Sequence, residues 1–427
     1  MSAANPAALA AVRALVDVEG GMYSNLSIKN RAAVLESARD RSFASALFYG
    51  TLERKRTLDE ALRPFLKGGS EKLDPEVRAV LESGVYRQLF LRTGNEAAPV
   101  SDSVEICRAL KKRSACGLVN AVLRKTGSIN REEIASFQSQ IRLSVCDPLY
   151  EKLTAVYGAE TERILEGTLI HEKDGLRVNT LRVSREKLQS LLTVEGITAE
   201  TAGLPDALLV SGGYIGTEAF RRGLFHVIGI PAQTAALALG AKPGERILDL
   251  CAAPGGKTAV IAEEMHDQGE IVALDKYASR IRIVEQNAAR LGISCIRAVT
   301  ADASGDLSQY GEFDRVLCDV PCSGFGEMAK KPELRYKDPN ISADLPALQL
   351  TLLENAASRV RKGGRVVYST CTVFPQENED VVSAFKQRHP EFAPAAILES
   401  TGEGERFFLP GRDGSEGFYI ASFERIW

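Results

Sequence analysis

Apolar residues in the first part of the chain recur every three or four positions, which is the spacing of amphipathic helices. One such series is Phe43, Leu47, Phe48 and Leu52, and another is Leu58, Leu62, Phe65 and Leu66. The run Asp74-Pro-Glu76 is typical of a helix start, because aspartate can cap a helix, proline suits its first position and glutamate favours the positive end of its dipole. The pattern predicts a separate all-α domain over residues 1–140.

The pattern changes after this domain. Asp147-Pro148 predicts the start of a helix that runs to about Gly158. Residues 175–183 alternate and are rich in β-branched side chains, which predicts a strand. Further helices are expected over residues 185–195 and 231–239. We therefore expect residues 141–240 to form a small α+β middle segment that links the first domain to the last.

From residue 241 onward, short apolar runs alternate with amphipathic stretches. The expected strands are Arg246–Leu250, Glu270–Asp275, Ile296–Thr300, Phe313–Asp319, Arg365–Ser369 and Gly417–Phe423. The expected helices are Thr258–Met265, Ser279–Leu291, Ala347–Val360 and Glu377–Arg388. Strands separated by helices of this length predict an α/β domain with a doubly wound, mostly parallel sheet over residues 241–427. Ligands of such sheets bind beyond the carboxyl ends of the strands.

Composition and charge add one feature to this picture. A chain of 427 residues is expected to form two or three domains, and 44% apolar with 26% charged residues is typical of globular proteins. The net charge of −3 is unevenly divided, because residues 1–150 hold 22 Lys/Arg and 17 Asp/Glu while the rest hold 31 and 39. Seven basic residues and no acidic one lie between Ile106 and Arg131, namely Arg108, Lys111, Lys112, Arg113, Arg124, Lys125 and Arg131. This run fits a polyanion-binding face and a solvated helix face about equally well.

Cysteine and histidine usage argues against two classes of site. The eight cysteines include no Cys-x-x-Cys pair and the four histidines are scattered, so neither a zinc site nor a disulfide framework fits, and we expect no metal. The alanine-rich start lacks the basic region of a signal peptide, and no apolar run approaches the length of a membrane span. We therefore expect a cytoplasmic protein with free thiols and no membrane partner.

The stretch from Ile247 to Thr258, Ile-Leu-Asp-Leu-Cys-Ala-Ala-Pro-Gly-Gly-Lys-Thr, passes from an apolar strand into a glycine turn and a helix start. Such a turn presents backbone N–H groups to a cofactor at the carboxyl end of a strand. Asp275 ends the next expected strand, 20 residues after Gly255. A carboxylate at that spacing can accept hydrogen bonds from both hydroxyls of a ribose. Because the turn lacks Gly-x-Gly-x-x-Gly, the amino-acid end of S-adenosylmethionine suits it better than a pyrophosphate does.

Other expected strands also end in polar or reactive groups. Asp302 follows one strand, Asp319 begins the run Asp-Val-Pro-Cys-Ser-Gly that contains Cys322, and the run Ser-Thr-Cys ends at Cys371. Cysteines at such places are usually inert packing residues, which we expect of Cys107, Cys116, Cys295 and Cys318. Two thiols that converge on one ligand-binding edge beside an aspartate are less easily explained by packing alone.

Two cysteines and an aspartate of this kind could catalyse methylation of a pyrimidine at carbon 5. Carbon 5 of a pyrimidine is a poor nucleophile, but addition of a thiolate to carbon 6 moves electron density to carbon 5, which can then attack an electrophilic methyl group. Loss of the carbon-5 proton and elimination of the thiol complete the reaction, and this covalent route divides one hard step into easier ones. A cysteine, an aspartate and a second cysteine meet its needs, although the residues alone do not rank Cys322 and Cys371.

Two parts of the chain resemble known families. Residues 9–125 are similar to the NusB-like RNA-binding domain, through Tyr49-Gly-Thr-Leu, Leu73-Asp and Leu118-Val-Asn-Ala-Val-Leu-Arg124. Most of residues 175–427 resembles the RNA cytosine-C5 methyltransferases, through Asp249-Leu-Cys-Ala-Ala-Pro-Gly-Gly-Lys-Thr, Asp275, Asp302-Ala, Asp319-Val-Pro-Cys-Ser-Gly-Phe-Gly and Ser369-Thr-Cys-Thr-Val-Phe-Pro-Gln-Glu-Asn-Glu. The whole chain resembles the bacterial RsmB (Sun-like) 16S rRNA methyltransferases.

The resemblance implies a Rossmann-like methyltransferase domain, S-adenosyl-L-methionine as cofactor and 16S rRNA as substrate. It implies that Cys371 is the nucleophile and that Cys322 helps to release the methylated RNA, whereas the Pro-Cys motif of DNA cytosine-C5 methyltransferases would favour Cys322. It implies that Asp319 contacts both cofactor and cytosine. The other implied cofactor contacts are Cys251, Ala252, Ala253, Pro254, Gly255, Gly256, Lys257, Asp275 and Asp302.

Two alternatives to this function stay open. The same chemistry could act on tRNA or 23S rRNA, or the chain could be a non-catalytic RNA-binding or assembly protein; in each case we expect a monomer.

A target base must leave its stack to reach a thiol in a cleft. Phosphate contacts are expected from the basic run and from Arg177, Arg182, Arg221 and Arg222. Three aromatic residues near the motif loops could stack on a base, although core packing is the commoner role: Phe325, Tyr336 and Phe374.

Overall fold

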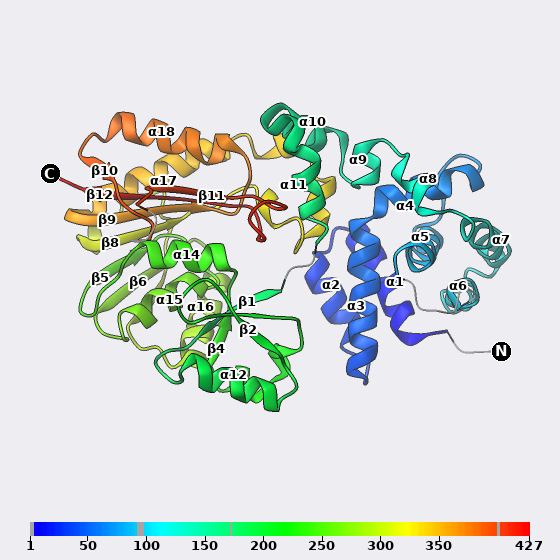
Figure 1. The fold of residues 1–427 in the computed structure, drawn as a ribbon, viewed down its shortest axis with the longest axis horizontal. Helices are drawn as coiled ribbons and strands as arrows, with labels where there is room; N and C mark the ends of the chain where they lie inside the picture. The colour runs from blue at the N-terminus through cyan, green and yellow to red at the C-terminus, as the bar shows by residue number, and fades with distance from the viewer. Residues whose placement is uncertain (1–3, 92–97, 171–172, 399–401) are drawn as a thin grey trace. The chain divides into compact units, whose positions relative to one another are not determined.

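A computed structural model describes residues 4–91, 98–170, 173–398 and 402–427. The chain forms two compact units (Figure 1). The first consists of Met1–Leu169 and the later segment Met328–Pro339, and the second consists of Ile170–Glu327 and Asn340–Trp427. The predicted domain boundaries at residues 140 and 240 stay a prediction. The two compact units have other bounds because contacts between residues on either side of those positions define them.

The first unit is helical, as the apolar periodicity predicts. Its helices are α1 (Pro6–Glu19), α2 (Ser24–Ala32), α3 (Ala38–Glu53), α4 (Lys55–Leu62), α5 (Pro75–Leu89), α6 (Ala98–Ala109), α7 (Cys116–Thr126), α8 (Arg131–Ala135), α9 (Ser139–Arg142), α10 (Asp147–Tyr157) and α11 (Thr161–Gly167). Short 3₁₀ turns are η1 (Arg63–Phe65), η2 (Ser70–Lys72), η3 (Arg113–Ala115) and η4 (Gly158–Glu160). The Asp74 side chain caps α5 as predicted, by accepting a hydrogen bond from the N–H of Glu76. The core contains Leu47, Val80 and Leu123.

A segment from the second half of the chain completes this helical unit. It contains the 3₁₀ helix η8 (Pro332–Tyr336), in which Arg335 is fully buried and donates hydrogen bonds to the carbonyl of Leu143 and the hydroxyl of Thr168. The hydroxyl of Tyr336 lies 2.8 Å from the Leu52 carbonyl and 2.9 Å from the Ser144 hydroxyl. Tyr336, a candidate for base stacking, is thus a packing residue of the helical unit, which is the commoner role expected of it.

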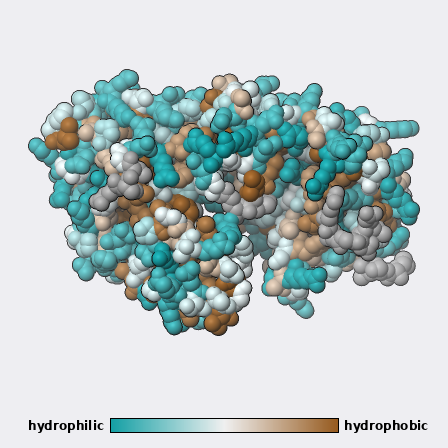
Figure 2. Space-filling model, in the orientation of Figure 1, coloured by the Kyte–Doolittle hydropathy of each residue, from teal (hydrophilic) through white to brown (hydrophobic). Residues whose placement is uncertain are grey.

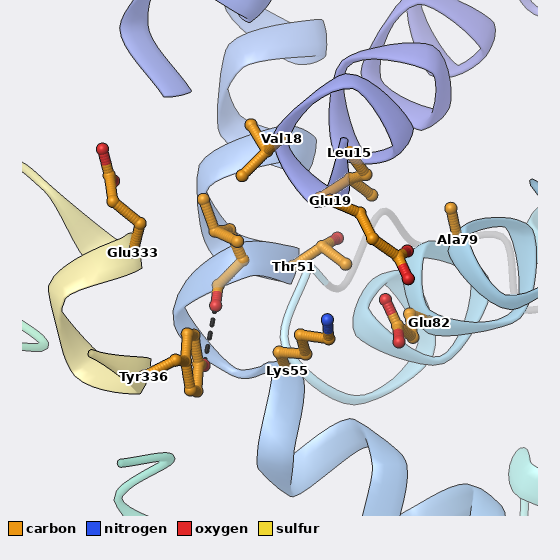
Figure 3. A pocket seen from close by; sticks show the side chains of 10 residues that line it. Leu15, Val18, Glu19, Thr51, Lys55, Ala79, Glu82, Glu333 and Tyr336 are labelled. Carbon is orange, nitrogen blue, oxygen red and sulfur yellow. Dashed lines mark hydrogen bonds between the residues drawn. The ribbon is translucent and has the colours of Figure 1, made fainter. Parts of the chain in front are cut away.

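The same segment lines a cavity of about 190 Å³ within the first unit (Figure 3). Glu19, Glu82 and Lys55 turn toward one another around it, across from Tyr336 of η8 (Figure 3). Burial raises the pKa of the Glu82 carboxyl to about 8, and the nearby Asp59 adds to the effect. The lining includes Tyr336 but none of the predicted catalytic or cofactor-binding residues.

The second unit begins with a four-stranded antiparallel sheet in the order β2-β3-β1-β4. Its strands are β1 (Asp174–Val178), β2 (Ala199–Thr201), β3 (Ala207–Val210) and β4 (Phe225–Val227), accompanied by α12 (Arg185–Val194), α13 (Glu218–Arg221) and η5 (Tyr214–Gly216). The strand expected to reach Val183 ends at Val178. The next residue, Asn179, is buried and donates hydrogen bonds to the carbonyls of Gly223 and Leu291, which turns the chain away from the sheet.

The larger sheet has the strand order β10-β12-β9-β8-β5-β6-β7, with β11 paired to β12. Its strands are β5 (Arg246–Asp249), β6 (Glu270–Asp275), β7 (Ile296–Thr300), β8 (Phe313–Asp319), β9 (Val360–Thr370), β10 (Phe392–Pro394), β11 (Glu405–Phe408) and β12 (Phe418–Arg425). The pairs from β7 to β9 are parallel, and β12 is antiparallel to its neighbours. The prediction of a doubly wound, mostly parallel sheet is confirmed. Strand β5 lies between β6 and β8, so the strand order reverses there, which is where ligands of such sheets usually bind.

Helices cover both faces of this sheet because its buried strands are apolar on both sides (Figure 1). On one side, Leu248 and Val366 pack with α17 (Leu345–Arg359) and α18 (Glu379–Arg388). On the other side, Ile247 and Val367 pack with α14 (Ile230–Ala238) and α15 (Gly256–Glu264), and α16 (Ala278–Leu291) lies beside α15 (Figure 1). The remaining 3₁₀ turns are η6 (Ser308–Tyr310), η7 (Phe325–Glu327), η9 (Pro339–Ser342) and η10 (Pro375–Glu377).

The face of the molecule seen in Figure 2 is mainly hydrophilic, with apolar side chains in scattered places. Among the residues that the structure describes, no helix is both long and apolar enough to pass through a membrane.

Candidate active site

The predicted cofactor turn connects β5 to α15. Gly255 adopts a φ of +97°, which favours glycine, and a Cβ there would lie 3.4 Å from Val284. The turn is anchored because the N–H of Ala252 donates to the Leu274 carbonyl of β6 at 2.8 Å. No side chain caps α15 within the described structure, so its first N–H groups face the turn, as an anionic ligand requires.

Asp249 fixes the start of this turn and was not among the predicted contact residues. It is buried at the end of β5, and the Thr258 hydroxyl of α15 donates to its Oδ2 at 2.7 Å. Burial raises the pKa of this carboxyl to about 7, against the lowering effect of the Thr258 hydrogen bond. Its Oδ1 has no partner among the described residues, which leaves an acceptor for a ligand or a water.

Asp275 and Asp302 end adjacent strands, as the sequence predicts. Asp275 is buried, accepts a hydrogen bond from the N–H of Tyr277 at 3.1 Å and lies 3.4 Å from the Arg280 guanidinium. Asp302 is exposed to solvent, and hydrogen bonds from Ser304 and then from Lys276 lower its pKa to about 2. The two carboxyl groups follow β6 and β7, whose parallel pairing runs to Asp275 and Thr300. Their contact with a cofactor stays a prediction.

The two cysteines singled out by the sequence lie side by side. Their sulfur atoms are 3.2 Å apart, and the N–H of Cys371 points at the sulfur of Cys322 at 3.3 Å. Strands β8 and β9 cause this proximity, because they pair in parallel up to Asp319 and Ser369 and deliver the two following loops to the same edge. Both side chains are half-buried. The expected convergence of two thiols on one edge of the sheet is therefore present.

Asp319 connects the thiol loops to the cofactor turn. Its Oδ2 lies 2.8 Å from the Lys257 amine of α15, and its Oδ1 accepts a hydrogen bond from the Ser369 hydroxyl at 2.7 Å. Burial alone would lower the pKa of Lys257, but the charge of Asp319 and the proximity of Cys371 and Asp249 raise it. The Lys257 ammonium is therefore kept charged close to the thiols. Sequence reasoning assigned this lysine only to the cofactor and missed its ion pair.

The resting thiol of Cys371 is held in the protonated form. The hydrogen bond with Cys322 is the first cause that raises its pKa, followed by burial and the charges of Glu327 and Asp319. The Cys371 sulfur lies 3.6 Å from a carboxylate oxygen of Glu327, which ends the 3₁₀ turn η7. Glu327 was missed by sequence reasoning, and its only signal was a carboxylate five residues after Cys322.

Other predicted residues have packing roles. Phe325 and Phe374 are buried against each other, with ring centroids 5.2 Å apart, so these two base-stacking candidates belong to the core. Burial also raises the pKa values of Cys295 and Cys107 to about 12, and Cys318 is fully buried, as expected of inert thiols. All eight cysteines are free. Among the described residues, no group of three or more histidine, cysteine or acidic side chains is arranged to hold a metal.

One expected RNA contact is wrong. Arg177 is fully buried and forms ion pairs with Glu263 and Glu264 of α15, so it cannot reach a phosphate. The positive charge of Arg177 suggested a phosphate contact, but α15 supplies two carboxylates that pair with the guanidinium instead. The other three arginines of that group are exposed, namely Arg182, Arg221 and Arg222.

The basic run near α7 divides into paired and unpaired residues. Lys112 forms ion pairs with Asp74 and Glu76, and Arg108 pairs with Glu105. Within the described structure, the remaining members are exposed and have no ion pair, namely Lys111, Arg113, Arg124, Lys125 and Arg131. Both interpretations of the run, a polyanion-binding face and a solvated helix face, are compatible with this arrangement.

Comparison with known proteins finds similar families and relatives along nearly the whole chain. The family described as 16S rRNA methyltransferase RsmB/F matches residues 236–424, the NusB family matches residues 6–127, and the ferredoxin-like domain of RsmF/B-like methyltransferases matches residues 148–214. A Bacillus subtilis relative named "Probable ribosomal RNA small subunit methyltransferase B" is 36% identical over 97% of this chain and 98% of its own length. The "Ribosomal RNA small subunit methyltransferase B" of Thermus thermophilus is 33% identical over 100% of this chain and 99% of its own length.

The structural comparison agrees with the sequence comparison. The crystal structure of PH0851 superposes with a TM-score of 0.82 and 27% identity, over 99% of each chain. Both the helical unit and the sheet of the second unit are therefore shared with a solved protein over nearly full length. The resemblance expected from the motifs is confirmed, and the chain belongs to the RsmB/F family of 16S rRNA methyltransferases.

Proposed function

We propose that the chain transfers a methyl group from S-adenosyl-L-methionine to carbon 5 of a cytosine in 16S rRNA, through a covalent bond between Cys371 and the base. The observation that carries this proposal is the pair of sulfur atoms 3.2 Å apart beside the Asp319–Lys257 ion pair. Membership of an rRNA methyltransferase family supports the reaction class, and the relatives' names support the small-subunit rRNA as substrate.

The residues at the crevice fit the proposed cofactor. The Cys251–Lys257 turn and the uncapped start of α15 offer N–H groups to its carboxylate, and Asp275 offers oxygen acceptors to its ribose hydroxyls. The Oδ1 of Asp249, which has no hydrogen-bond partner in the described part of the chain, is a further acceptor at the same strand edge. When bound, the cofactor supplies an electrophilic methyl group.

The first step requires the Cys371 thiolate. Because the pKa of the Cys371 thiol is raised, the thiol must lose its proton when the cytosine binds. A carboxylate oxygen of Glu327, 3.6 Å from the Cys371 sulfur, is within reach of this proton. The sulfur then bonds to carbon 6 of the cytosine, and the electron pair of the carbon 5–carbon 6 double bond moves to carbon 5 and into the ring. Lys257 keeps a positive charge beside the reacting thiolate, and Asp319 is placed to hydrogen-bond the ring nitrogen or the exocyclic amine.

The second half of the reaction needs a proton acceptor for carbon 5 and a way to release the methylated RNA from Cys371. Carbon 5 takes the methyl group as the methyl–sulfonium bond breaks, and that bond's electron pair stays on the cofactor sulfur. The Cys322 thiol lies against the Cys371 sulfur, where it can donate its proton to Cys371 as the Cys371–carbon 6 bond breaks and that bond's electron pair returns to sulfur. The Cys322 thiolate so formed can accept the proton of carbon 5, and the electron pair of that C–H bond restores the carbon 5–carbon 6 double bond. We therefore assign Cys322 to release of the methylated RNA, in line with the family resemblance.

Two cysteine variants test this assignment in one experiment. Cys371→Ala is expected to abolish methyl transfer to 16S rRNA, because no nucleophile remains to activate carbon 5. Cys322→Ala is expected to allow attack and slow release, so that a protein–RNA adduct accumulates and resists denaturing electrophoresis. Near-parental methyl transfer by Cys371→Ala, or the absence of an adduct in Cys322→Ala under conditions where the parent turns over, would exclude these roles.

The identity of the substrate is tested separately. Bisulfite mapping of rRNA from a strain without this protein should show one newly unprotected cytosine in 16S rRNA. Loss of protection in tRNA or 23S rRNA instead would keep the chemistry and change the substrate. Failure of the purified protein to bind S-adenosylmethionine saturably would favour a non-catalytic RNA-binding role.

A further inference from the structure

Glu377 lies between the two thiol loops and has no role in the chemistry described so far. It ends the 3₁₀ turn η10, six residues after Cys371, and only 4% of it is exposed. The backbone N–H of Ser323 donates to its Oε2 at 2.8 Å, and the Ser323 hydroxyl donates to its Oε1 at 2.5 Å. Ser323 follows Cys322 directly, so this carboxylate holds the Cys322 loop through both the N–H and the hydroxyl of one residue.

The same carboxylate also contacts the loop of Cys371 and helix α17. The Thr372 hydroxyl, next to Cys371, lies 3.5 Å from Oε1 and 2.8 Å from the Ser323 hydroxyl. The buried Gln349 amide of α17 donates to Oε2 at 3.0 Å and to the Pro321 carbonyl at 3.0 Å. The residues that adjoin both thiols therefore meet at one buried side chain.

Glu377 is itself held in place by strand β9. The Tyr368 hydroxyl donates to the Glu377 carbonyl at 2.6 Å. The next residue, Asn378, is buried, accepts a hydrogen bond from the Thr370 hydroxyl at 2.5 Å and donates to the Thr372 carbonyl at 3.2 Å. These hydrogen bonds fix Glu377 to the end of β9, which carries Cys371. Because the Glu377 carboxylate also binds Ser323, the position of the Cys322 loop depends on the end of β9.

We propose that Glu377 is a positioning residue that sets the separation of the Cys322 and Cys371 sulfur atoms. Beyond the end of β8, the N–H of Val320 still donates to the Ser369 carbonyl of β9 at 3.1 Å, whereas Pro321 and Ser323 are held by the side chains of Gln349 and Glu377. The position of the Cys322 loop therefore depends on these side-chain anchors. The proposal deepens the proposed function and rests on it only where the two thiols are said to act in succession on one base. A displacement of reacting groups by about 1 Å can lower a rate about 10²-fold.

The first test is Glu377→Gln, which keeps the size of the side chain and replaces one acceptor oxygen with an NH₂ group facing N–H and O–H donors. We expect kcat for methyl transfer to fall about 10²-fold. The KM for S-adenosylmethionine should stay unchanged, because the hydrogen bonds of the Glu377 carboxylate go to the thiol loops and α17 rather than to the cofactor turn. The matched control is Asp380→Asn, which makes the same charge change at an exposed position in the first turn of α18. It should behave like the parent.

A second readout reports the thiol separation without any methyl transfer. Diamide oxidises two adjacent thiols to a disulfide and takes up the two electrons and two protons that they release. The rate at which the Cys322 and Cys371 peptides become linked, followed by mass spectrometry, is expected to fall by about an order of magnitude in Glu377→Gln and to stay at the parental value in Asp380→Asn. If the parent proves inactive on cytosine, the proposed function fails while this comparison still decides the role of Glu377.

Clear outcomes would overturn the proposal. A folded Glu377→Gln protein that links its thiols at the parental rate excludes a positioning role, even if its melting temperature falls, because a merely structural residue would show that pattern. If Glu377→Gln does not fold, Ser323→Ala replaces it, since this change removes a single hydroxyl from the same contact. Ser323→Ala should slow both methyl transfer and disulfide formation to a smaller degree, and parental values for both would exclude the proposal.

Discussion

The chemistry of the site depends at the residue scale on the protonation of Cys371. Its contact with Cys322 is the largest cause of a raised pKa, with burial second. A thiol with a raised pKa is mainly protonated near neutral pH, and its reactive thiolate fraction grows as the pH rises. The parent should therefore alkylate at Cys371 faster, and methylate RNA with higher kcat/KM, as the pH increases from about 6 to about 9.

Cys322→Ala supplies the comparison for this prediction. The substitution removes the hydrogen bond that raises the pKa most, so the Cys371 alkylation profile should move to lower pH. Iodoacetamide labelling of the Cys371 peptide across the pH range measures this without RNA. An identical profile in the parent and in Cys322→Ala would show that the thiol pair does not set the pKa.

At the element scale, the segment Met328–Pro339 is the feature with the clearest consequence. It leaves the methyltransferase sheet after the Cys322 loop, enters the helical unit, buries Arg335 there and packs the half-buried Tyr336. Tyr336→Phe removes a hydroxyl bonded to Leu52 and Ser144, and we expect a loss of about 1–3 kcal/mol in the free energy of unfolding. Denaturant titration measures the loss. The control is Tyr23→Phe in the same unit, which should leave stability unchanged because Tyr23 is 73% exposed. Equal stability of both variants would contradict the packing role of η8.

At the scale of the whole molecule, positive charge gathers on the first unit although the net charge is −3. The exposed and unpaired Lys111 and Arg113 adjoin α7, and each phosphate contact that they make would release counterions. The double variant Lys111→Ala/Arg113→Ala should therefore weaken 16S rRNA binding and reduce the slope of log affinity against log salt by about 2. Lys242→Ala, an exposed lysine in the second unit, is the control. An unchanged slope would favour the solvated helix face.

Much of the fold follows from local patterns. Strand boundaries at β6, β7 and β8 match the predicted ranges, because apolar runs bounded by turn residues are short-range signals. The antiparallel edge strands β10 and β11 were not expected, since strands of three or four residues carry too little pattern. The second half of the chain was also expected to stay out of the helical domain, yet Met328–Pro339 packs within it.

By itself, the sequence determined the central strands of the large sheet and most of the helices. It also determined which strand ends carry Asp275, Asp319, Cys322 and Cys371 and, through its motifs, the family. Those features are encoded locally, in periodicity and in short runs of residues. Only the tertiary structure decided which side chains meet: two thiols 49 positions apart in the chain at 3.2 Å, Lys257 on Asp319, and Glu377 between both loops. It also decided that Arg177 is buried. Contacts of this kind depend on how distant segments pack, because the parallel pairing of β8 and β9 and the helices over them set distances that no local pattern encodes.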